Sequence, residues 1–179
     1  ELDSIQRWDP ITIKDSTFRQ VRLSREDRAG RPHSIPISFP LDFPNGFLQL
    51  SCDLPMDLSN SCRTIRSADG CFSRALESCS SFFDEIDEID SSCVVLEPTS
   101  KNRRDRFRRL ALPDYRGCSI QFSIDPFSCR APVDVSLLGN ELLISPLRAR
   151  WNVSFQRWNR NVSVLTNLTN LLGVTLTSS

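Results

Sequence analysis

The sequence predicts a mainly β fold, a two-layer antiparallel sandwich with one disulfide-stapled helix near residues 70–90 and a proline-rich N-terminal arm. Apolar and polar residues alternate through the last third of the chain, seven cysteines are spread over residues 52–129, and prolines recur between residues 30 and 46. Hydrophobic residues make up 39% of the 179 residues, which suits a sandwich with solvated outer faces.

The first 46 residues are expected to form a segment of their own. Short apolar runs at residues 11–13 and 21–23 flank a polar turn, which favours a β-hairpin. From residue 32 to residue 44, every fourth residue is a proline, and proline donates no hydrogen bond to a helix or a central strand. We therefore expect a hairpin and an extended arm over residues 1–46, followed by a disulfide-containing β-rich domain over residues 47–179.

One helix is expected, over residues 71–90. Apolar residues recur there at a spacing of three to four: Phe72, Leu76, Cys79, Phe82 or Phe83, Ile86 and Ile89. Ser67 or Asp69 is placed to cap its start. The acidic residues at 84–90 fill the opposite face, where they are solvated or pair with the basic run at 101–109. Because carboxylates oppose the dipole at a helix C-terminus, the helix is expected to end early.

The last third of the chain predicts strands. Ile120, Phe122 and Ile124 alternate with polar residues, and residues 133–138 meet residues 141–144 across Gly139-Asn140, a two-residue hairpin signal. The clearest strand is expected at residues 147–155, where apolar residues occupy the odd positions. Residues 93–96 predict a short buried strand, and residues 165–176 fit either a strand or a short helix.

The cysteines predict an oxidising, secretory setting. No two are close enough for a zinc site and His33 is the single histidine, so structural disulfides are expected among Cys52, Cys62, Cys71, Cys79, Cys93, Cys118 and Cys129. Because their number is odd, one is free or bonded to another chain. Either Cys118 bonds Cys129, or one of these two bonds an upstream cysteine. Cys71 and Cys79 cannot bond each other on one helix, where they are about 12 Å apart.

Two further motifs fit a secreted protein. The basic run at 101–109 is expected to form a loop that a proprotein convertase cleaves after Arg109, the other processing residues being Arg103, Arg106 and Arg108; the alternative is a solvated basic loop. Sequons at Asn152, Asn161 and Asn167 are candidate glycosylation sites. Asn152 falls on the wet face of the expected strand, where a glycan has room.

Composition and motifs exclude several classes. The 22 basic and 22 acidic residues balance, which argues against a nucleic-acid binder. With one histidine and no Gly-x-Ser-x-Gly, phosphate-binding or His-Glu motif, the chain is expected to have no catalytic residues, no metal site and no cofactor. No run of about 18 apolar residues is present, so contact with a membrane is expected only through an anchor outside this chain.

The expected function is a non-enzymatic extracellular recognition module, either a secreted ligand or a surface-glycoprotein ectodomain, that acts as a subunit of a protein complex. Its partner would be a receptor or co-subunit, linked through the odd cysteine, and Trp158 is the candidate contact. One alternative is a viral envelope or fusion-type glycoprotein subunit processed at Arg109. Another is an extracellular lipid carrier. Seven free thiols would instead indicate a reduced intracellular protein.

Overall fold

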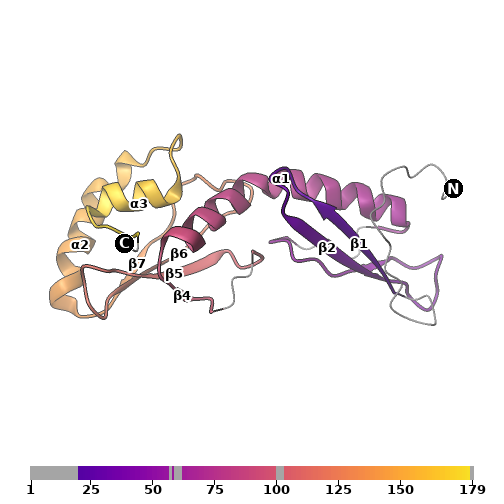
Figure 1. Cartoon of the computed structure of the whole chain (residues 1–179), viewed down its shortest axis with the longest axis horizontal. Coiled ribbons are helices and arrows are strands. Elements are labelled where there is room, and N and C mark those ends of the chain that lie inside the picture. Colours follow the sequence, from indigo (N-terminus) through magenta and orange to yellow (C-terminus); the bar gives the residue numbers. More distant parts are fainter. Residues whose placement is uncertain (1–19, 57, 59–61, 100–102, 178–179) are drawn as a thin grey trace. The chain divides into compact units, whose positions relative to one another are not determined.

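The structure is a computed structural model, and it describes residues 20–56, 58, 62–99 and 103–177. Contacts divide the chain into a first unit, residues 1–80, and a second unit, residues 81–179. Each unit combines antiparallel strands with α-helix (Figure 1). The fold is therefore mixed α/β, and the expected β-sandwich is wrong. The division falls inside helix α1 (Ile65–Ser92), whereas the sequence predicted a boundary at residue 46.

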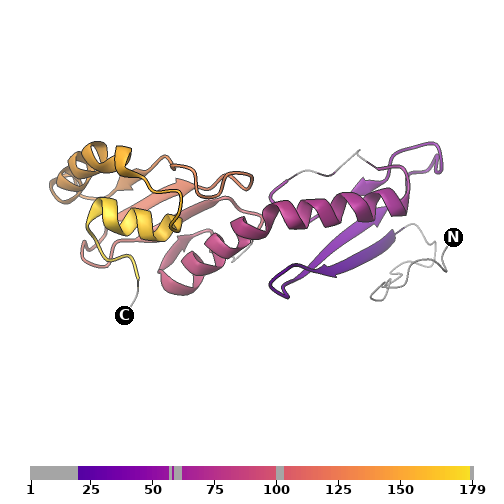
Figure 2. The same ribbon diagram turned by 90° about the horizontal axis from the view of Figure 1, so that it is seen from above.

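The first unit consists of an antiparallel sheet and the first part of α1, which lies along it (Figure 2). The strands are β1 (Gln20–Glu26), β2 (Pro32–Ser38) and β3 (Gln49–Leu50), in the order β1-β2-β3. Arg25 of β1 donates two hydrogen bonds to Asp69 of α1, at 2.8 and 2.7 Å. Residues 11–19 of the expected hairpin lie outside the described residues, and residues 21–23 belong to β1, which pairs with β2.

Strand β2 is central although it contains two prolines, so the expectation of an extended arm is wrong here. Pro32 and Pro36 are exposed, while the alternate residues His33, Ile35 and Ile37 are buried. The Pro36 carbonyl accepts from the Ser51 N–H at 3.1 Å, on the β3 side. Because the N–H and C=O of one strand residue point the same way, the missing N–H of Pro36 costs no bond to β1.

Asp27 holds the turn between β1 and β2. Its carboxylate accepts from the backbone N–H groups of Ala29 and Arg31, at 2.9 and 3.0 Å, and from the Arg31 guanidinium. It also lies 3.2 Å from Nε2 of buried His33. Burial acts to raise the pKa of this carboxyl, but the hydrogen bonds from Arg31, His33 and Ala29 outweigh it and lower the pKa to about 2. Asp27 therefore stays ionised in the folded chain.

Helix α1 confirms the expected helix and extends it at both ends. Its buried apolar side chains follow the expected spacing: Ala68, Phe72, Ala75, Leu76, Cys79, Phe82, Phe83, Ile86 and Ile89. Thr64 caps its start instead of Ser67 or Asp69, since Thr64 Oγ1 accepts from the Ser67 N–H at 3.1 Å.

Arginines neutralise the acidic end of α1. Arg108 donates from Nε and Nη2 to Asp90 at 2.7 and 3.0 Å, and Arg103 donates from Nε to Asp87 at 3.0 Å. These cations offset the unfavourable interaction of the carboxylates with the helix dipole. The helix therefore continues to Ser92 rather than ending early, and the suggested pairing of the acidic block with the basic run is confirmed.

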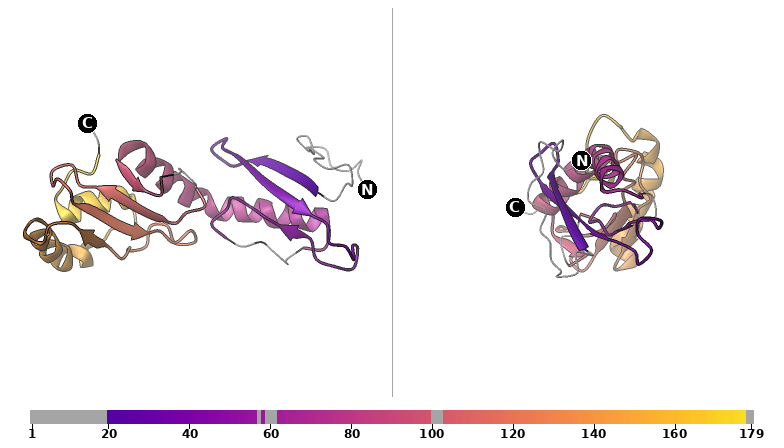
Figure 3. Two further views of the ribbon diagram at one scale, coloured as in Figure 1. Left: turned by 90° about the horizontal axis from the view of Figure 1, so that it is seen from below. Right: turned by 90° about the vertical axis from the view of Figure 1, so that its right-hand side faces the viewer.

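The second unit is built on four antiparallel strands in the order β4-β5-β6-β7, with the end of α1 on one face (Figure 3). They are β4 (Val95–Glu97), β5 (Phe107–Ala111), β6 (Ser119–Ser123) and β7 (Ser136–Leu138). The alternation predicted in β6 is confirmed, with Ile120 and Phe122 buried and Gln121 and Ser123 more exposed.

The hairpin expected across Gly139-Asn140 is wrong, because helix α2 (Glu141–Ser154) begins there. Asn140 is its N-cap, and the Asn140 side chain accepts from the Leu142 N–H at 2.9 Å. Gly139 is required for the turn. Its φ is 142°, and a Cβ at this position would lie 2.6 Å from the Cys118 Sγ.

The strand expected at residues 147–155 is also wrong, because these residues form the end of α2 and the start of a short 3₁₀ helix, η1 (Phe155–Arg157). Residues 165–176, which fitted two interpretations, lie mostly in helix α3 (Val164–Leu172). No helix among the described residues combines the length and apolarity needed to cross a bilayer.

Candidate protein-binding face on helix α2

Helix α2 exposes a row of apolar residues, which we call the α2 stripe: Leu142, Pro146, Ala149 and Val153. The spacing of four, three and four residues places them on one side of the helix. Leu142 and Val153 are 86% and 75% exposed. Exposed apolar side chains gathered on one face make this side of α2 a candidate surface for binding another protein.

The opposite side of α2 is firmly packed. Ile144, Leu147 and Trp151 are buried, and the Trp151 ring lies 5.4 Å from that of Phe155. Arg150 donates from Nη1 to the Leu172 carbonyl at 2.7 Å, which ties α2 to α3. The stripe therefore stands on a rigid support, so binding would need little rearrangement.

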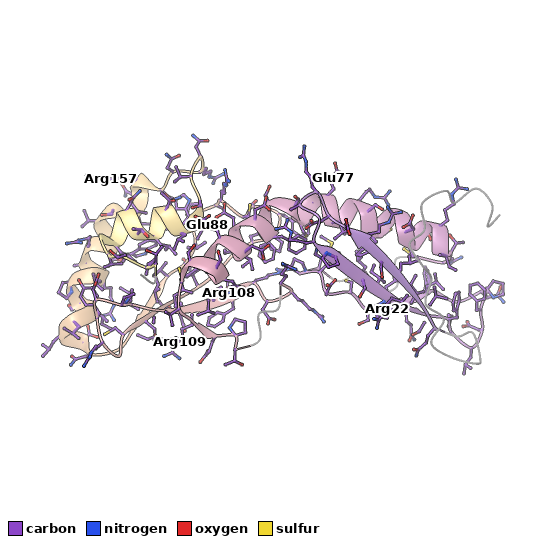
Figure 4. The ribbon with its side chains drawn as sticks, viewed as in Figure 1. Arg22, Glu77, Glu88, Arg108, Arg109 and Arg157 are labelled. Atoms are coloured by element: carbon purple, nitrogen blue, oxygen red, sulfur yellow. The ribbon has the colours of Figure 1, made fainter. Side chains whose placement is uncertain are left out.

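Charged residues border the stripe. Arg148 donates to Glu141 at 2.6 Å, and both side chains are largely exposed. Arg157, labelled in Figure 4, is also exposed. An apolar centre with a polar rim is the usual organisation of a protein–protein interface.

A smaller exposed apolar pair lies on β4, at one edge of the sheet. Val94, just before the strand, and Leu96, within it, are 46% and 40% exposed. An edge strand has backbone groups that no neighbouring strand pairs. This edge is a secondary candidate for contact with a partner.

Only part of the predicted processing run forms a loop where the structure describes it: Arg103 and Arg106 lie between β4 and β5, before the strand begins. Arg108 and Arg109 lie on β5, an inner strand of the sheet (Figure 4). Arg108 is fully buried, and its Nη1 donates to the carbonyls of Asp105 and Phe107 at 2.7 and 2.8 Å. Arg109 donates to Ser119 Oγ at 2.9 Å.

Upstream, Arg103 pairs with α1 and the Arg106 carbonyl accepts from the Ile124 N–H at 3.0 Å. Residues 101 and 102 of the basic run lie outside the described residues. A convertase reads an extended segment that is accessible. Arg108 is buried, and β5 is paired on both sides, which disfavours cleavage after Arg109.

All seven cysteines are free thiols in the structure, and Cys62, Cys79, Cys93 and Cys118 are buried. Cys71 and Cys79 share α1, as the sequence suggested. Burial is the largest cause that raises the pKa of Cys93 to about 11, and the negative charges of Glu88 and Asp90 raise it further. Burial is also the main cause of the raised pKa of Cys62 and of Cys129. These three thiols are therefore suited to packing and not to nucleophilic chemistry.

The sequons differ in accessibility. Asn152 and Asn161 are exposed, Asn152 on α2 rather than on a strand. Asn167 is 3% exposed, and its amide nitrogen donates to the Asn159 and Ser163 carbonyls at 2.8 and 3.1 Å. A glycan has no room at Asn167.

Trp158, the predicted partner contact, is half-buried. Its Nε1 donates to the Arg130 carbonyl at 3.0 Å, and its ring lies edge-on to Trp151 at 6.3 Å. Much of this indole is thus engaged within the chain. Among the described residues, no group of three or more metal-ligating side chains comes together.

Two family models match the chain. The model described as "FANCL UBC-like domain 2" matches residues 1–86, and the model described as "FANCL UBC-like domain 3" matches residues 81–179. The chain belongs to this family. The two matches meet inside α1, close to the division between the two structural units.

Relatives and a solved structure agree with this assignment. The mouse "E3 ubiquitin-protein ligase FANCL" is 29% identical over 170 residues, which covers 93% of this chain and 45% of that protein. The Drosophila melanogaster "E3 ubiquitin-protein ligase Fancl" is 25% identical over 111 residues, covering 62% and 29%. The "Crystal Structure of FANCL" shares the fold with a TM-score of 0.80 at 20% identity, covering 99% of this chain and 49% of that one. The chain thus spans about half the length of these proteins or less.

The family overturns the expected function. A secreted or cell-surface glycoprotein, a processed viral subunit and a lipid carrier are all wrong, because the matching domains are those of a ubiquitin ligase. The non-enzymatic assignment is wrong for the same reason. Ubiquitin ligases act inside cells, where cysteines stay reduced, so the extracellular location is also wrong. The broad expectation of a protein partner holds in this family, while nothing supports a disulfide link to it.

The α2 stripe was missed in the sequence because its residues were assigned to strands. Val153 and Ala149 were placed on a buried sheet face, and Leu142 in a hairpin. The available signal was Asn140 followed by Glu141, because a capping residue and an acidic first turn are typical of the start of a helix.

Proposed function

We propose that this chain is the part of a ubiquitin ligase that holds the protein to be modified, and that the α2 stripe contacts that protein. The observation that carries the proposal is the exposed apolar stripe on a rigidly packed helix of a FANCL UBC-like domain. A ligase must position a protein substrate beside the ubiquitin that it receives. An apolar, pre-organised surface supplies such binding at little entropic cost.

Three of the seven cysteines are poorly suited to carry ubiquitin on a thiol. A thioester requires a reactive thiolate, which a lowered pKa favours. The pKa values of Cys62, Cys93 and Cys129 are instead raised. The α2 stripe, in contrast, requires no titrating group.

The test uses the full-length ligase that contains this chain. A photo-crosslinking amino acid at Val153 captures proteins that contact the stripe, and mass spectrometry identifies which of them the ligase ubiquitinates. In the variant Leu142→Glu/Val153→Glu, ubiquitin transfer to that substrate is expected to fall at least about tenfold, since burying a leucine or valine side chain contributes about 1.5–3 kcal/mol and both are lost.

Two controls interpret the result. Ubiquitin transfer to the ligase itself should be unchanged, and Gln156→Glu, a charge placed on an exposed residue of η1 just after α2, should have little effect. If the double variant modifies its substrate at the wild-type rate, the α2 stripe is not the contact surface.

A further inference from the structure

A second surface of the second unit is hollowed beside the start of β7, at Ser136. A groove of about 420 Å³ lies there, lined by residues of β5, β6 and the segment from Asp125 to Ser136. β6 and β7 pair from Ser119 with Leu138 to Gln121 with Ser136. Strand β6 therefore extends by two residues, Phe122 and Ser123, beyond its last pair with β7. The groove begins at these two residues.

The backbone of Ser123 faces the β7 side of β6, across the groove from the segment that leads into β7. The next residue, Ile124, donates its N–H to the Arg106 carbonyl on the β5 side at 3.0 Å. Successive residues of a strand direct their backbone groups to opposite sides. The N–H and C=O of Ser123 thus point away from β5, into the region where an added extended chain could pair with β6.

The charge of the groove has one sign. Asp125 and Asp134 are its charged lining residues, and both are exposed. Asp125 Oδ1 accepts from the Phe127 N–H at 3.0 Å, which fixes that carboxylate. Among the residues that the structure describes, nothing pairs with the Asp134 carboxylate.

The rest of the lining is largely apolar or uncharged. Phe107, Phe122, Pro132 and Val133 form much of the wall. Such a wall suits the aliphatic stem of a lysine or arginine, whose cationic end would reach a carboxylate. An acidic side chain in the same place would meet two negative charges without compensation.

We propose that this groove binds an extended segment of a partner protein that presents lysine or arginine side chains between apolar residues. The segment would pair with the free backbone edge of β6 at Ser123 and place a basic side chain near Asp125 and Asp134. That the partner is the substrate of a ligase rests on the proposed function, whereas the preference for a basic segment rests on the groove alone.

The test is fluorescence anisotropy with the whole chain and three capped, labelled nonapeptides. One alternates valine with lysine, one alternates valine with glutamate, and one is the lysine peptide with alternate amides N-methylated. The lysine peptide is expected to bind at least about tenfold more tightly than the glutamate peptide at low salt, because opposite charges attract and like charges repel there. N-methylation is expected to reduce binding strongly, because it removes donors for strand pairing.

Variants connect this preference to the groove. Asp125→Asn and Asp134→Asn should each weaken lysine-peptide binding about two- to fivefold, as expected for partly exposed charge pairs. Asp114→Asn, an exposed carboxylate on the turn between β5 and β6, is the matched control and should change nothing. Equal binding of the lysine and glutamate peptides, or variants that keep their melting temperature and full affinity, would overturn the proposal.

The proposal about the groove and the proposed function of the α2 stripe can be refuted separately. Leu142→Glu/Val153→Glu should leave lysine-peptide affinity unchanged, because neither residue lines the groove. If substrate modification depends on the stripe but peptides bind without charge preference, the inference about the groove falls and the proposed function stands. If peptides bind as expected but the stripe variant modifies its substrate normally, the proposed function falls alone.

Discussion

Removing the carboxylate of Asp90 is expected to destabilise the second unit by about 3–5 kcal/mol, the usual cost of breaking a buried ion pair. Arg108 is 0% exposed, and Asp90 accepts from two of its donors at 2.7 and 3.0 Å. Each hydrogen bond to a charged group is worth about 1.5–3 kcal/mol, so the two bonds give about 3–6 kcal/mol, which overlaps that range. Because a domain is stable by about 5–15 kcal/mol, Asp90→Ala would remove a large part of this stability.

Two further variants separate charge from packing. Asp90→Leu/Arg108→Met removes both charges, so no ion remains buried alone, and it should cost less than Asp90→Ala. Arg116→Met removes an exposed arginine from the turn before β6 and should change stability by no more than about 0.5 kcal/mol.

The assay is urea unfolding at pH 7, followed by tryptophan fluorescence in a Trp8→Phe background. The remaining indoles, Trp151 and Trp158, both belong to the second unit and report its unfolding. A loss below about 1 kcal/mol for Asp90→Ala, or a double variant as unstable as the single one, would refute the argument that an uncompensated buried guanidinium sets the cost.

Three other predictions follow from local contacts. Asn140→Ala should cost about 1 kcal/mol in the same unfolding assay while Asn140→Ser is nearly neutral, because both asparagine and serine cap a helix; equal losses would argue against the cap. The pKa of Asp27 is about 2 in the folded chain and about 3.9 unfolded, so this carboxylate contributes about 2.6 kcal/mol above pH 4, which is lost as the pH falls towards 2. Hydrogen exchange of the Ile35 amide should therefore accelerate less in Asp27→Asn than in the wild type over that range, and parallel curves would contradict the assignment. Iodoacetamide at pH 8 should label half-buried Cys71 well before buried Cys93, and an intact mass that rises on reduction would show disulfides that the structure lacks.

The sequence predicted the elements whose apolar pattern serves packing alone. In α1, Phe72, Leu76 and Ile86 recur with the period of a helix because one side of it is buried along its length. In β6, Ile120 and Phe122 alternate with polar residues because one face of the sheet is covered. A single buried face produces a single period, and the period identifies the element.

Helix α2 was misassigned because it has two apolar faces. Leu147 and Trp151 pack inwards, whereas Ala149 and Val153 belong to the exposed stripe. Together they occupy every second position and imitate a strand. The exposed apolar residues of the stripe therefore hid the helix, because the period that identifies an element requires a single apolar face.

The cysteines and prolines led to the wrong predictions of disulfides and of an extended arm for a related reason. A buried free cysteine behaves as a small apolar residue, and the sequence does not show whether Cys79 or Cys93 is packed or bonded. Pro36 fits a central strand only because its missing N–H falls on the side of short β3. Both facts depend on neighbours that are distant in sequence, which no local pattern reports.

The burial of Asn167 decides how this protein can be made. Its amide is fully engaged with Asn159 and Ser163, yet it begins an Asn-Leu-Thr sequon. Oligosaccharide transfer in the endoplasmic reticulum modifies such asparagines on the nascent chain, before α3 could pack. A chain routed there with a signal peptide would carry a sugar where the fold has no space, so heterologous production belongs in a cytosol without that machinery, such as the bacterial one.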